Sequence, residues 1–447
     1  MSMSRREFLK TNTAVALGLA AEGPVLPDFR FPSSGSGARA EGVAERPVRL
    51  AVLGTGNRGR GLMSVLLTMK GVEFPALCDI QPANLELARQ LVEKAGGKKP
   101  EAYGKDETDY RRLLERDDVD AVIIASYWEW HTPMAVDAMK AGKYAGVEVP
   151  AAYSLDECWE LVRTYESTGV PCMMLENWSF RRDNLAVLNM IRAGLLGEIV
   201  HCHCAHSHDC IDHWFFDPET GLDRWAAKYL LTHNRDQYPT HQQGPVLSWM
   251  DIGTGDYYDS IASTATGGFG INDYFARRFG PEHPNAKRRY KQGDVVSSVV
   301  RTKKGKSIVI NYDMQLPRPY DNRWMIQGNR GLYDEDRSVV YLNGRSPQYH
   351  QWEAFGPYQE LYEHKWWKAF RSEAGQLSHA GTDYLELRLF LESVRNRTQT
   401  PLDVYDAALM SANGPLSEES IAKGGVPVPY PDFTGGQWQK NRPTFAV

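Results

Sequence analysis

Tyr238 and His241 are the residues of this 447-residue chain whose types and spacing most directly suggest chemistry. They lie three positions apart in the segment Tyr-Pro-Thr-His, and the ring of Pro239 restricts the backbone between them. A phenol and an imidazole exchange protons readily, so a pair held at fixed spacing is suited to general acid–base catalysis. The alternative that stays open is a structural turn with a buried tyrosine.

A glycine motif near the start of the chain is typical of a dinucleotide-binding turn. Gly54, Gly56 and Gly59 follow the apolar segment 49–53 and lead into a helix-like segment. The first glycine permits a tight turn, the second lets the backbone approach a pyrophosphate, and the third allows the helix to pack on the strand. The motif therefore predicts a nucleotide cofactor at this turn.

Three further residues indicate which dinucleotide the turn would hold. Asn57 and Arg58 lie inside the glycine motif, so we expect both to contact the cofactor. Asp79 ends the next apolar segment, at the position where a carboxylate binds the adenosine ribose hydroxyls. A negative charge there disfavours the extra phosphate of NADP, so the predicted cofactor is NAD.

Five other polar or aromatic candidates follow later predicted strands: Trp128, His131, Glu148, Glu176 and Asn177. The carboxyl ends of parallel strands meet at one edge of a sheet, where the nicotinamide half of a dinucleotide lies. We therefore expect Trp128, His131, Glu148 and Asn177 to contact the cofactor. A structural or capping role is the open alternative for His131, and Glu176 is placed like Asn177.

The segment 201–210 alternates histidine and cysteine in a way that resembles a metal site. On a strand, Cys202, Cys204, His206 and His208 would share one face. Neighbours on such a face lie roughly 6.6 Å apart along the strand, so four in a row cannot converge on one tetrahedral ion. We interpret the segment as a polar strand face lining a pocket, and we predict no metal.

The elements that must position these residues fall into two groups. Up to residue 175, strand-like and helix-like segments alternate, which predicts a doubly wound parallel sheet of the Rossmann type. The expected strands are 49–53, 74–79, 102–103, 121–125, 144–148 and 171–175, and the expected helices are 59–70, 82–95, 110–115, 131–141 and 154–168.

After Asn177 strands and helices no longer alternate. The order of the segments predicts an α+β domain with a large, mainly antiparallel sheet and a helix on one face. The expected strands are 198–207, 295–301, 307–312, 323–327 and 339–342, and the expected helices are 182–193, 244–251, 383–397 and 404–423. Apart from the helix at 244–251, residues 215–270 have weak periodicity and are expected to be a long, functional insertion. The predicted domains are 47–176 and 177–435, with a tail at 436–447.

Composition narrows the function classes. The net charge is −5 and basic runs are short, which argues against a nucleic-acid partner.

The first 46 residues are expected to be a signal and linker, because Ser4-Arg-Arg-Glu-Phe-Leu-Lys10 matches a twin-arginine export signal and 38–40 fits a cleavage site. We therefore expect export to the periplasm or cell surface; a chance Arg-Arg pair is the alternative. No other apolar stretch is long enough to span a bilayer, and the six cysteines are expected to be buried, mostly reduced thiols.

Several segments together carry a family resemblance. The most specific are Glu-Asn-x-x-x-Arg-Arg-Asp at 176–183 and Tyr-Pro-Thr-His at 238–241, and the others are 197–202, 208–209, 244–245 and 317–320. They resemble glycoside hydrolase family 109 over roughly residues 47–435. The resemblance implies a fold similar to Gfo/Idh/MocA oxidoreductases, bound NAD and α-N-acetylgalactosaminidase activity.

The resemblance also implies a redox-assisted mechanism. NAD oxidises the sugar at carbon 3, a base removes the acidified hydrogen at carbon 2, and the aglycone leaves. Water then adds, the sugar is reduced again, and no NAD is consumed. Sugar dehydrogenases of the wider group usually read Glu-Lys-Pro where this chain has Glu148-Val149-Pro150. The missing lysine disfavours an ordinary dehydrogenase.

Tyr238 and His241 occupy positions that the resemblance identifies with active-site residues of the family. We assign Tyr238 as the base for carbon 2 and His241 as the acid for the leaving oxygen. His206 stands where the family usually has an active-site acid–base tyrosine. A histidine can take over that role with a lower pKa, so His206 is a third catalytic candidate, and the replacement puts the identity of the sugar in question. The substrate-binding residues that the resemblance implies are Arg181, His208, Asp209 and Tyr320.

Two other functions stay open beside the glycosidase. One is an NAD-dependent sugar dehydrogenase or epimerase of the same fold, and the other is a catalytically inactive carbohydrate-binding relative. The family resemblance and an open second sheet also predict a homodimer.

Overall fold

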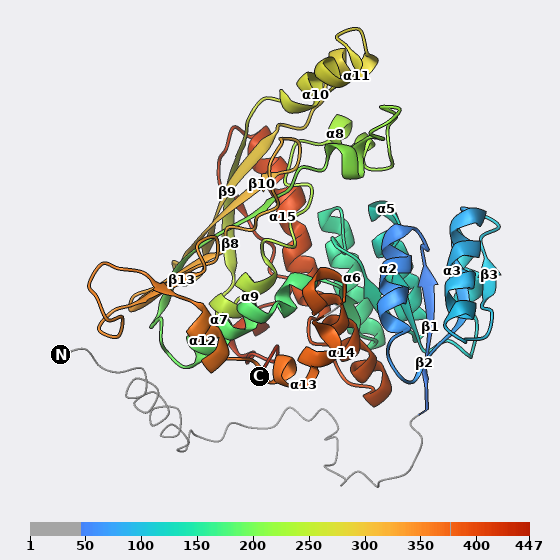
Figure 1. The fold of residues 1–447 in the computed structure, drawn as a ribbon, viewed down its shortest axis with the longest axis horizontal. Coiled ribbons are helices and arrows are strands. Elements are labelled where there is room, and N and C mark those ends of the chain that lie inside the picture. Colours follow the sequence, from blue (N-terminus) through green and yellow to red (C-terminus); the bar gives the residue numbers. More distant parts are fainter. Residues whose placement is uncertain (1–45, 376) are drawn as a thin grey trace.

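The computed structural model describes residues 46–375 and 377–447, whose strands form two separate sheets (Figure 1). The predicted twin-arginine signal and cleavage site lie outside these residues. The first sheet has six strands in the order β3-β2-β1-β4-β5-β6, and the second has nine in the order β14-β13-β12-β11-β7-β10-β9-β8-β15.

The first sheet is parallel throughout, which confirms the predicted Rossmann fold. Its strands are β1 (Val48–Leu53), β2 (Val72–Cys78), β3 (Glu101–Tyr103), β4 (Ala121–Ile124), β5 (Tyr144–Val147) and β6 (Cys172–Met174). The helices between them are α2 (Asn57–Leu66), α3 (Pro82–Lys94), α4 (Tyr110–Leu114), α5 (Trp128–Lys140) and α6 (Leu155–Thr168). The central strands are almost wholly apolar because helices cover both faces of the sheet.

The second sheet is mainly antiparallel, as predicted, with one parallel pair between β7 and β10. Its strands are β7 (Ile199–Ser207), β8 (Tyr258–Ala265), β9 (Val295–Thr302), β10 (Ser307–Asp313), β11 (Met325–Gly328), β12 (Gly331–Asp334), β13 (Val339–Leu342), β14 (Glu353–Ala354) and β15 (Val428–Pro429). Along β9, buried Val296 and Val300 alternate with exposed Val299 and Arg301, so this strand has one covered and one open face.

Helices of the second half join the two sheets (Figure 1). Its longer helices are α7 (Arg182–Arg192), α9 (Gly244–Met250), α10 (Gly270–Phe279), α13 (Lys365–Ala374), α14 (Thr382–Asn396) and α15 (Val404–Ala422), and its shorter ones are α8 (Ala227–Thr232), α11 (Pro284–Lys287) and α12 (Gly356–Leu361). α15 lies between β8 of the large sheet and α6 of the Rossmann half, and α14 contacts α2 and β1. The chain therefore returns to the cofactor domain near its end.

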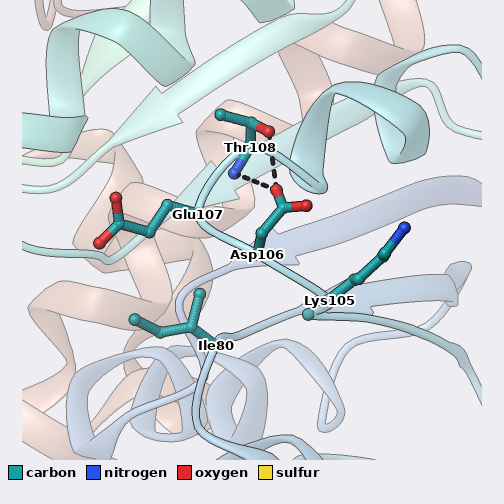
Figure 2. Close-up of a pocket in the computed structure, with 6 residues that line it drawn as sticks. Ile80, Lys105, Asp106, Glu107 and Thr108 are labelled. Atoms are coloured by element: carbon teal, nitrogen blue, oxygen red, sulfur yellow. Dashed lines mark hydrogen bonds between the residues drawn. The ribbon is translucent and has the colours of Figure 1, made fainter.

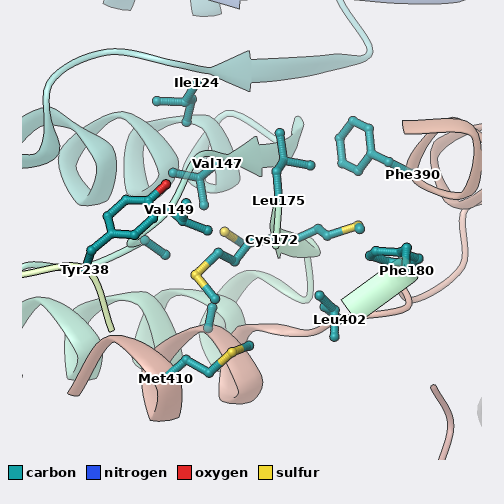
Figure 3. Packing of buried hydrophobic residues seen from close by; sticks show 14 of the residues in the cluster. Ile124, Val147, Val149, Cys172, Leu175, Phe180, Tyr238, Phe390, Leu402 and Met410 are labelled. Atoms are coloured by element: carbon teal, nitrogen blue, oxygen red, sulfur yellow. The ribbon is translucent and has the colours of Figure 1, made fainter. Parts of the chain in front are cut away.

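One apolar core runs across the junction of the two halves (Figure 3). Val149, which occupies the position of the lysine in related dehydrogenases, is buried there beside Val147, and Tyr238 belongs to the same cluster. Phe445 of the predicted tail packs on Phe180. The tail thus contributes to the folded structure.

Three expectations about local structure were wrong. Residues 258–265 form β8 instead of irregular chain. A shift in register between Tyr258 and Ser260 breaks the alternation of this strand, and the buried Ser263 satisfies its hydroxyl with Ser298. α2 begins at Asn57 and α5 at Trp128, two and three residues earlier than expected.

The cysteines follow the prediction: all six are free and buried. Among the described residues, no helix combines the length and apolar composition needed to cross a bilayer.

Candidate active site

The glycine turn has the shape that a dinucleotide pyrophosphate requires. Gly54 has a φ of +92°, and a Cβ there would lie 2.5 Å from the carbonyl oxygen of Ala125. A Cβ on Gly59 would lie 2.1 Å from the oxygen of Gly54, whereas one on Gly56 would meet no atom of the described chain within 4 Å. No side chain in the described structure caps α2, so its first N–H groups face this open space. The turn therefore fits NAD.

Asp79 is fixed beside the turn by three hydrogen bonds. Its Oδ2 accepts from the backbone and hydroxyl of Thr55 at 2.7 and 3.1 Å, and its Oδ1 accepts from the backbone of Gln81 at 2.8 Å. The carboxylate thus stands at the end of β2, where the adenosine ribose of NAD would bind.

A surface cavity of about 470 Å³ lies beside Ile80, the residue that follows Asp79 (Figure 2). It is lined by Ile80, Gly104, Lys105, Asp106, Glu107 and Thr108. The Ile80 side chain is exposed, and a Cβ on Gly104 would lie 2.2 Å from the backbone oxygen of Asp79. The cavity therefore lies next to the position predicted for the ribose of NAD.

Arg58 joins the turn to the C-terminal half through ion pairs. Its guanidinium lies 2.5 Å from Glu148 and 2.8 Å from Asp383 of α14. Asn177 donates to the other oxygen of Asp383 at 2.8 Å, and Asn57 accepts a hydrogen bond from Arg60. Three predicted cofactor residues, Arg58, Glu148 and Asn177, are thus brought together by an aspartate that sequence analysis did not single out.

Asp383 gave no distinct sequence signal, because α14 carries other charged residues, such as Glu386 and Arg388. Although burial opposes ionisation, hydrogen bonding from His379 and the charge of Arg58 hold the pKa of Asp383 below its ordinary value. Burial and the charge of Asp383 raise the pKa of neighbouring Glu386, so this fully buried carboxyl keeps its proton. The cluster therefore places the guanidinium of Arg58 in ion pairs with Glu148 and Asp383.

Tyr238 and His241 lie side by side, as the sequence predicted, and a buried glutamate orients the imidazole. The Tyr238 hydroxyl is 3.4 Å from Nε2 of His241, and Nδ1 of His241 is 2.8 Å from Glu176. Glu176 has no exposed surface. It lies two residues after the end of β6 and was expected beside the cofactor, without a link to His241. The three residues form a continuous path for a proton from phenol to imidazole to carboxylate.

His206 completes this group from the neighbouring strand β7. Its ring centroid lies 4.8 Å from that of Tyr238 and 5.4 Å from that of His241. The side chain is buried, and neither ring nitrogen has a hydrogen-bond partner among the described residues. Burial and the neighbouring imidazoles hold its pKa well below the ordinary value, so the ring is neutral. Such a group is suited to bind a polar ligand.

An aromatic wall bounds the group on one side. The ring of Trp178 lies 5.7 Å from His241, and its indole donates to the hydroxyl of Tyr320 at 2.5 Å. Tyr320 also faces His206 and His208 at 5.5 and 5.0 Å. Tyr320 and His208 thus lie beside the predicted catalytic residues.

The predicted substrate residues differ in their freedom to bind a sugar. The guanidinium of Arg181 lies between Trp178 and Trp324 and is paired with Asp183 and Glu335, so it supports the wall from behind. Burial lowers the pKa of His208 to about 4 and raises that of Asp209, which also accepts from the backbone of Ile211.

Trp128 and His131 occupy supporting positions. Trp128 is buried among aromatic rings, 6.1 Å from Tyr238. Both ring nitrogens of His131 face backbone oxygens, those of Pro150 at 2.8 Å and Ser126 at 3.1 Å. The geometry favours the structural alternative for His131, because its ring is fully engaged by the loops around the cleft.

The histidines and cysteines of β7 do not gather around one point. His201 bonds Ser307 and His203 bonds Asn311, while Cys202 and Cys204 face the core. Within residues 46–375 and 377–447, no group of three or more His, Cys, Asp or Glu side chains has the arrangement of a metal site.

Fold and site together define a class of protein: a Rossmann domain fit for NAD, joined to a sheet domain that supplies an acid–base group. Residues 48–176 match the model of the oxidoreductase family with an NAD-binding Rossmann fold. Residues 180–440 match the model of the glycosyl hydrolase 109 C-terminal domain. The chain belongs to glycosyl hydrolase family 109.

Full-length relatives agree with this assignment. The chain is 38% identical to an alpha-N-acetylgalactosaminidase of Tannerella forsythia over all of both chains. It is 35% identical to an alpha-N-acetylgalactosaminidase of Shewanella oneidensis, over 100% of this chain and 99% of the relative. The protein is thus an NAD-dependent glycosidase.

Solved structures confirm the fold. The NAD binding oxidoreductase from Klebsiella pneumoniae matches with a TM-score of 0.68 at 19% identity, covering 86% of this chain and 99% of that chain. A myo-inositol dehydrogenase from Lactobacillus casei, solved with NAD(H) and myo-inositol, matches with a TM-score of 0.60 at 16% identity, covering 88% and 99%.

Proposed function

We propose that this glycosidase is an α-N-acetylgalactosaminidase that works by transient oxidation of the sugar at carbon 3, elimination, water addition and re-reduction. The two relatives named for that activity support the sugar. One observation carries the chemistry: Tyr238, His241 and Glu176 form a continuous proton path beside the unpartnered ring of His206. These groups can move protons at a sugar ring without a metal.

The cofactor site and the proton path serve different steps, which are oxidation of the sugar and proton transfer. When bound, NAD supplies a reversible oxidant for the carbon-3 hydroxyl, which makes the hydrogen at carbon 2 acidic and leaves no net NAD consumption. The turn 54–59 would hold its pyrophosphate, Asp79 its ribose and the cavity beside Ile80 its adenine. The chain's own side chains must then remove one proton and donate another.

Local geometry and electrostatics support the opposite order of the two proton roles to the one expected from sequence. Burial and the charges of Glu148 and Glu176 raise the pKa of Tyr238 far above the ordinary value, so its hydroxyl keeps its proton. Glu176 accepts a hydrogen bond from the Nδ1–H of His241. Nε2 of the neutral ring is then unprotonated, and its electron pair can take a proton. His241 is therefore the base in our proposal, and Tyr238 is the acid.

The elimination step balances with these two groups. Nε2 of His241 takes the proton from carbon 2, and the electron pair of that bond forms a double bond between carbons 1 and 2. The bond from carbon 1 to the aglycone breaks, and the leaving oxygen takes the proton of the Tyr238 hydroxyl. After the aglycone has left, the proton on His241 is lost to water, and Tyr238 recovers a proton from water through the 3.4 Å contact with His241. A water molecule then adds at carbon 1 and gives one proton to Tyr238, while His241, protonated again by solvent, returns a solvent-derived proton to carbon 2.

His206, His208, Asp209 and Tyr320 are proposed to bind the sugar. His206 has two unpartnered ring nitrogens, so as a neutral imidazole it can donate one hydrogen bond to the substrate and accept another. It stands where relatives usually have tyrosine, and for that reason the sugar is the part of the proposal that needs testing first.

A screen of aryl glycosides, α and β, without added cofactor tests the function. We expect release of the aryl group from the α-N-acetylgalactosaminide with no net NADH. A sugar dehydrogenase would instead make NADH in proportion to product, and a binding protein would turn nothing over. Either of those outcomes would refute the glycosidase, whereas hydrolysis of a different aryl glycoside would change only the sugar.

Two further proposals concern the protein's setting. We infer a homodimer that forms through the open face of the large sheet, because strands such as β9 present Val299 at 50% exposure on that side. Export by the twin-arginine route is proposed from the Arg5-Arg6 motif, since a protein that folds before export can carry NAD with it. Size-exclusion chromatography with light scattering and cell fractionation test them separately.

A further inference from the structure

A row of aromatic rings crosses from the Rossmann half to the insertion of the C-terminal half. Tyr127 stacks on Trp225 with ring centroids 5.3 Å apart and planes 15° apart. Trp225 meets Trp128 edge to face at 5.2 Å, Trp128 meets Trp214 at 5.9 Å, and Trp214 meets Tyr238 at 4.8 Å. The row therefore ends at the proposed catalytic tyrosine.

The other end of the row lies at the cofactor cleft. Tyr127 follows β4 in the loop whose residue Ala125 comes within 2.5 Å of a Cβ placed on Gly54. Burial raises the pKa of the Tyr127 hydroxyl, and the charge of Asp79 raises it further. Tyr127 is thus two residues from the backbone that packs against the glycine turn.

A polar contact fastens the same two segments. Glu129, two residues after Tyr127, pairs with Lys228 and accepts a hydrogen bond from the hydroxyl of Tyr229. Although partial burial opposes it, these bonds lower the pKa of Glu129 and keep it charged. We call residues 224–229 the strap; its second half is the first turn of α8, which Figure 1 shows above α5.

The strap is also anchored at its start. The guanidinium of Arg224 donates to the backbone oxygens of Asp212 and His213, and the Arg224 backbone donates to the oxygen of Phe215 at 2.9 Å. One side of the strap is therefore held by its own domain, and the other side by the stack and the ion pair. A segment built in this way can hold two walls of a cleft together.

We propose that the strap is a cofactor-retaining clasp, in which Trp225 stacked on Tyr127 and Lys228 paired with Glu129 close the cleft over bound NAD. A glycosidase that regenerates its NAD at each turnover gains nothing from exchanging it, and each loss would stop catalysis. The clasp concerns retention of NAD, so it does not depend on which sugar the enzyme hydrolyses.

The test measures exchange of NAD directly. Protein loaded with radiolabelled NAD is mixed with excess unlabelled NAD, and retained label is followed over time. We expect exchange about tenfold faster for Trp225→Ala and Tyr127→Ala, since a stacked aromatic pair contributes on this scale. Glu129→Gln, which keeps the size of the side chain, should accelerate exchange by a smaller factor. Trp352→Ala is the matched control, because Trp352 is 42% exposed and contacts Arg337 of the C-terminal half.

Exchange at the wild-type rate in all three clasp variants would overturn the proposal, as would an equal acceleration in the control. Should the alanine variants fail to fold, as judged by circular dichroism, Glu129→Gln alone decides. If the variants raise KM for an aryl glycoside and leave NAD exchange unchanged, the aromatic row contacts the substrate. That result would likewise refute the clasp. Failure of the glycosidase proposal would leave these exchange rates unaffected, so the two outcomes can be told apart.

Discussion

Two polar clusters lie near the carboxyl ends of the Rossmann strands, and they differ in how tightly their central charged or titratable groups are held. Around Arg58, the acids Glu148 and Asp383 are held by ion pairs of 2.5 and 2.8 Å, although Asn177 Oδ1 and both carboxyl oxygens of Glu386 have no partner among the described residues. Around His241, the contact to Tyr238 is 3.4 Å long, and both ring nitrogens of His206 have no partner among the described residues. The first cluster resembles a scaffold, and the second resembles a site that a ligand completes.

The difference has a physical basis. A buried polar group without a partner costs about 1–3 kcal/mol, so it persists where function requires it. Removing one member of a buried ion pair leaves an uncompensated charge and lowers stability. Substitutions in the His241 cluster should therefore change catalysis, whereas substitutions around Arg58 should change stability.

The largest expected effect is on the rate. Tyr238→Phe and His241→Ala should each lower kcat by about 100-fold or more, because each removes a proton-transfer group. Both variants should retain NAD and fold, since neither residue belongs to the cofactor turn. Steady-state kinetics with an aryl glycoside and assay of bound NAD after denaturation measure the two properties. Loss of NAD together with activity would show that the clusters are not separate.

Substitution in the Arg58 cluster should lower stability, in contrast to the His241 cluster, where the main effect is on the rate. Arg58→Met leaves Glu148 and Asp383 without their shared cation, and we expect the free energy of unfolding to fall by about 3–5 kcal/mol. Denaturant unfolding of this variant beside His241→Ala sharpens the comparison. If His241→Ala were the less stable of the two, the assignment of scaffold and site would be reversed.

A third variant tests the ribose carboxylate. Asp79→Ala removes a charge-assisted contact worth about 1.5–3 kcal/mol, so NAD should bind about 10- to 100-fold more weakly. Isothermal titration of apoprotein with NAD gives the affinity, and kcat at saturating NAD should change little. An affinity equal to that of the wild type would place the ribose elsewhere.

The smallest effect is expected on kcat when Glu176, which holds the imidazole of His241, is replaced. Glu176 is buried and touches His241 alone among the proposed catalytic residues, so it acts as a positioning residue. Glu176→Gln keeps the shape of the side chain and should lower kcat by about tenfold while KM stays close to that of the wild type. A change in KM alone would mean that Glu176 contributes to substrate binding instead.

Much of this architecture could be predicted from sequence, but not all of it. The Rossmann strands are buried on both faces and read as short apolar runs, and α14 has an amphipathic pattern of helical period, so these elements were confirmed. β8 could not be found because its register shift and its buried Ser263 disrupt the alternation on which strand prediction depends.

The candidate site shows the same limit. Tyr238 and His241 lie three residues apart, and their pairing was predictable from spacing. Glu176 is 65 residues from His241 in sequence and Asp383 is 325 from Arg58, so only the fold brings them together. The aromatic stack between Tyr127 and Trp225 likewise joins segments of different domains.

The central claim is that protons move at carbon 2 of the sugar, between His241 and Tyr238. Turnover of an α-N-acetylgalactosaminide in heavy water tests it most directly, with the released sugar examined by NMR and mass spectrometry. The account predicts one deuterium at carbon 2, because the proton that leaves during elimination is replaced from solvent. A direct displacement between two carboxylates would leave that carbon untouched. Hydrolysis that yields sugar without deuterium at carbon 2 would contradict the account.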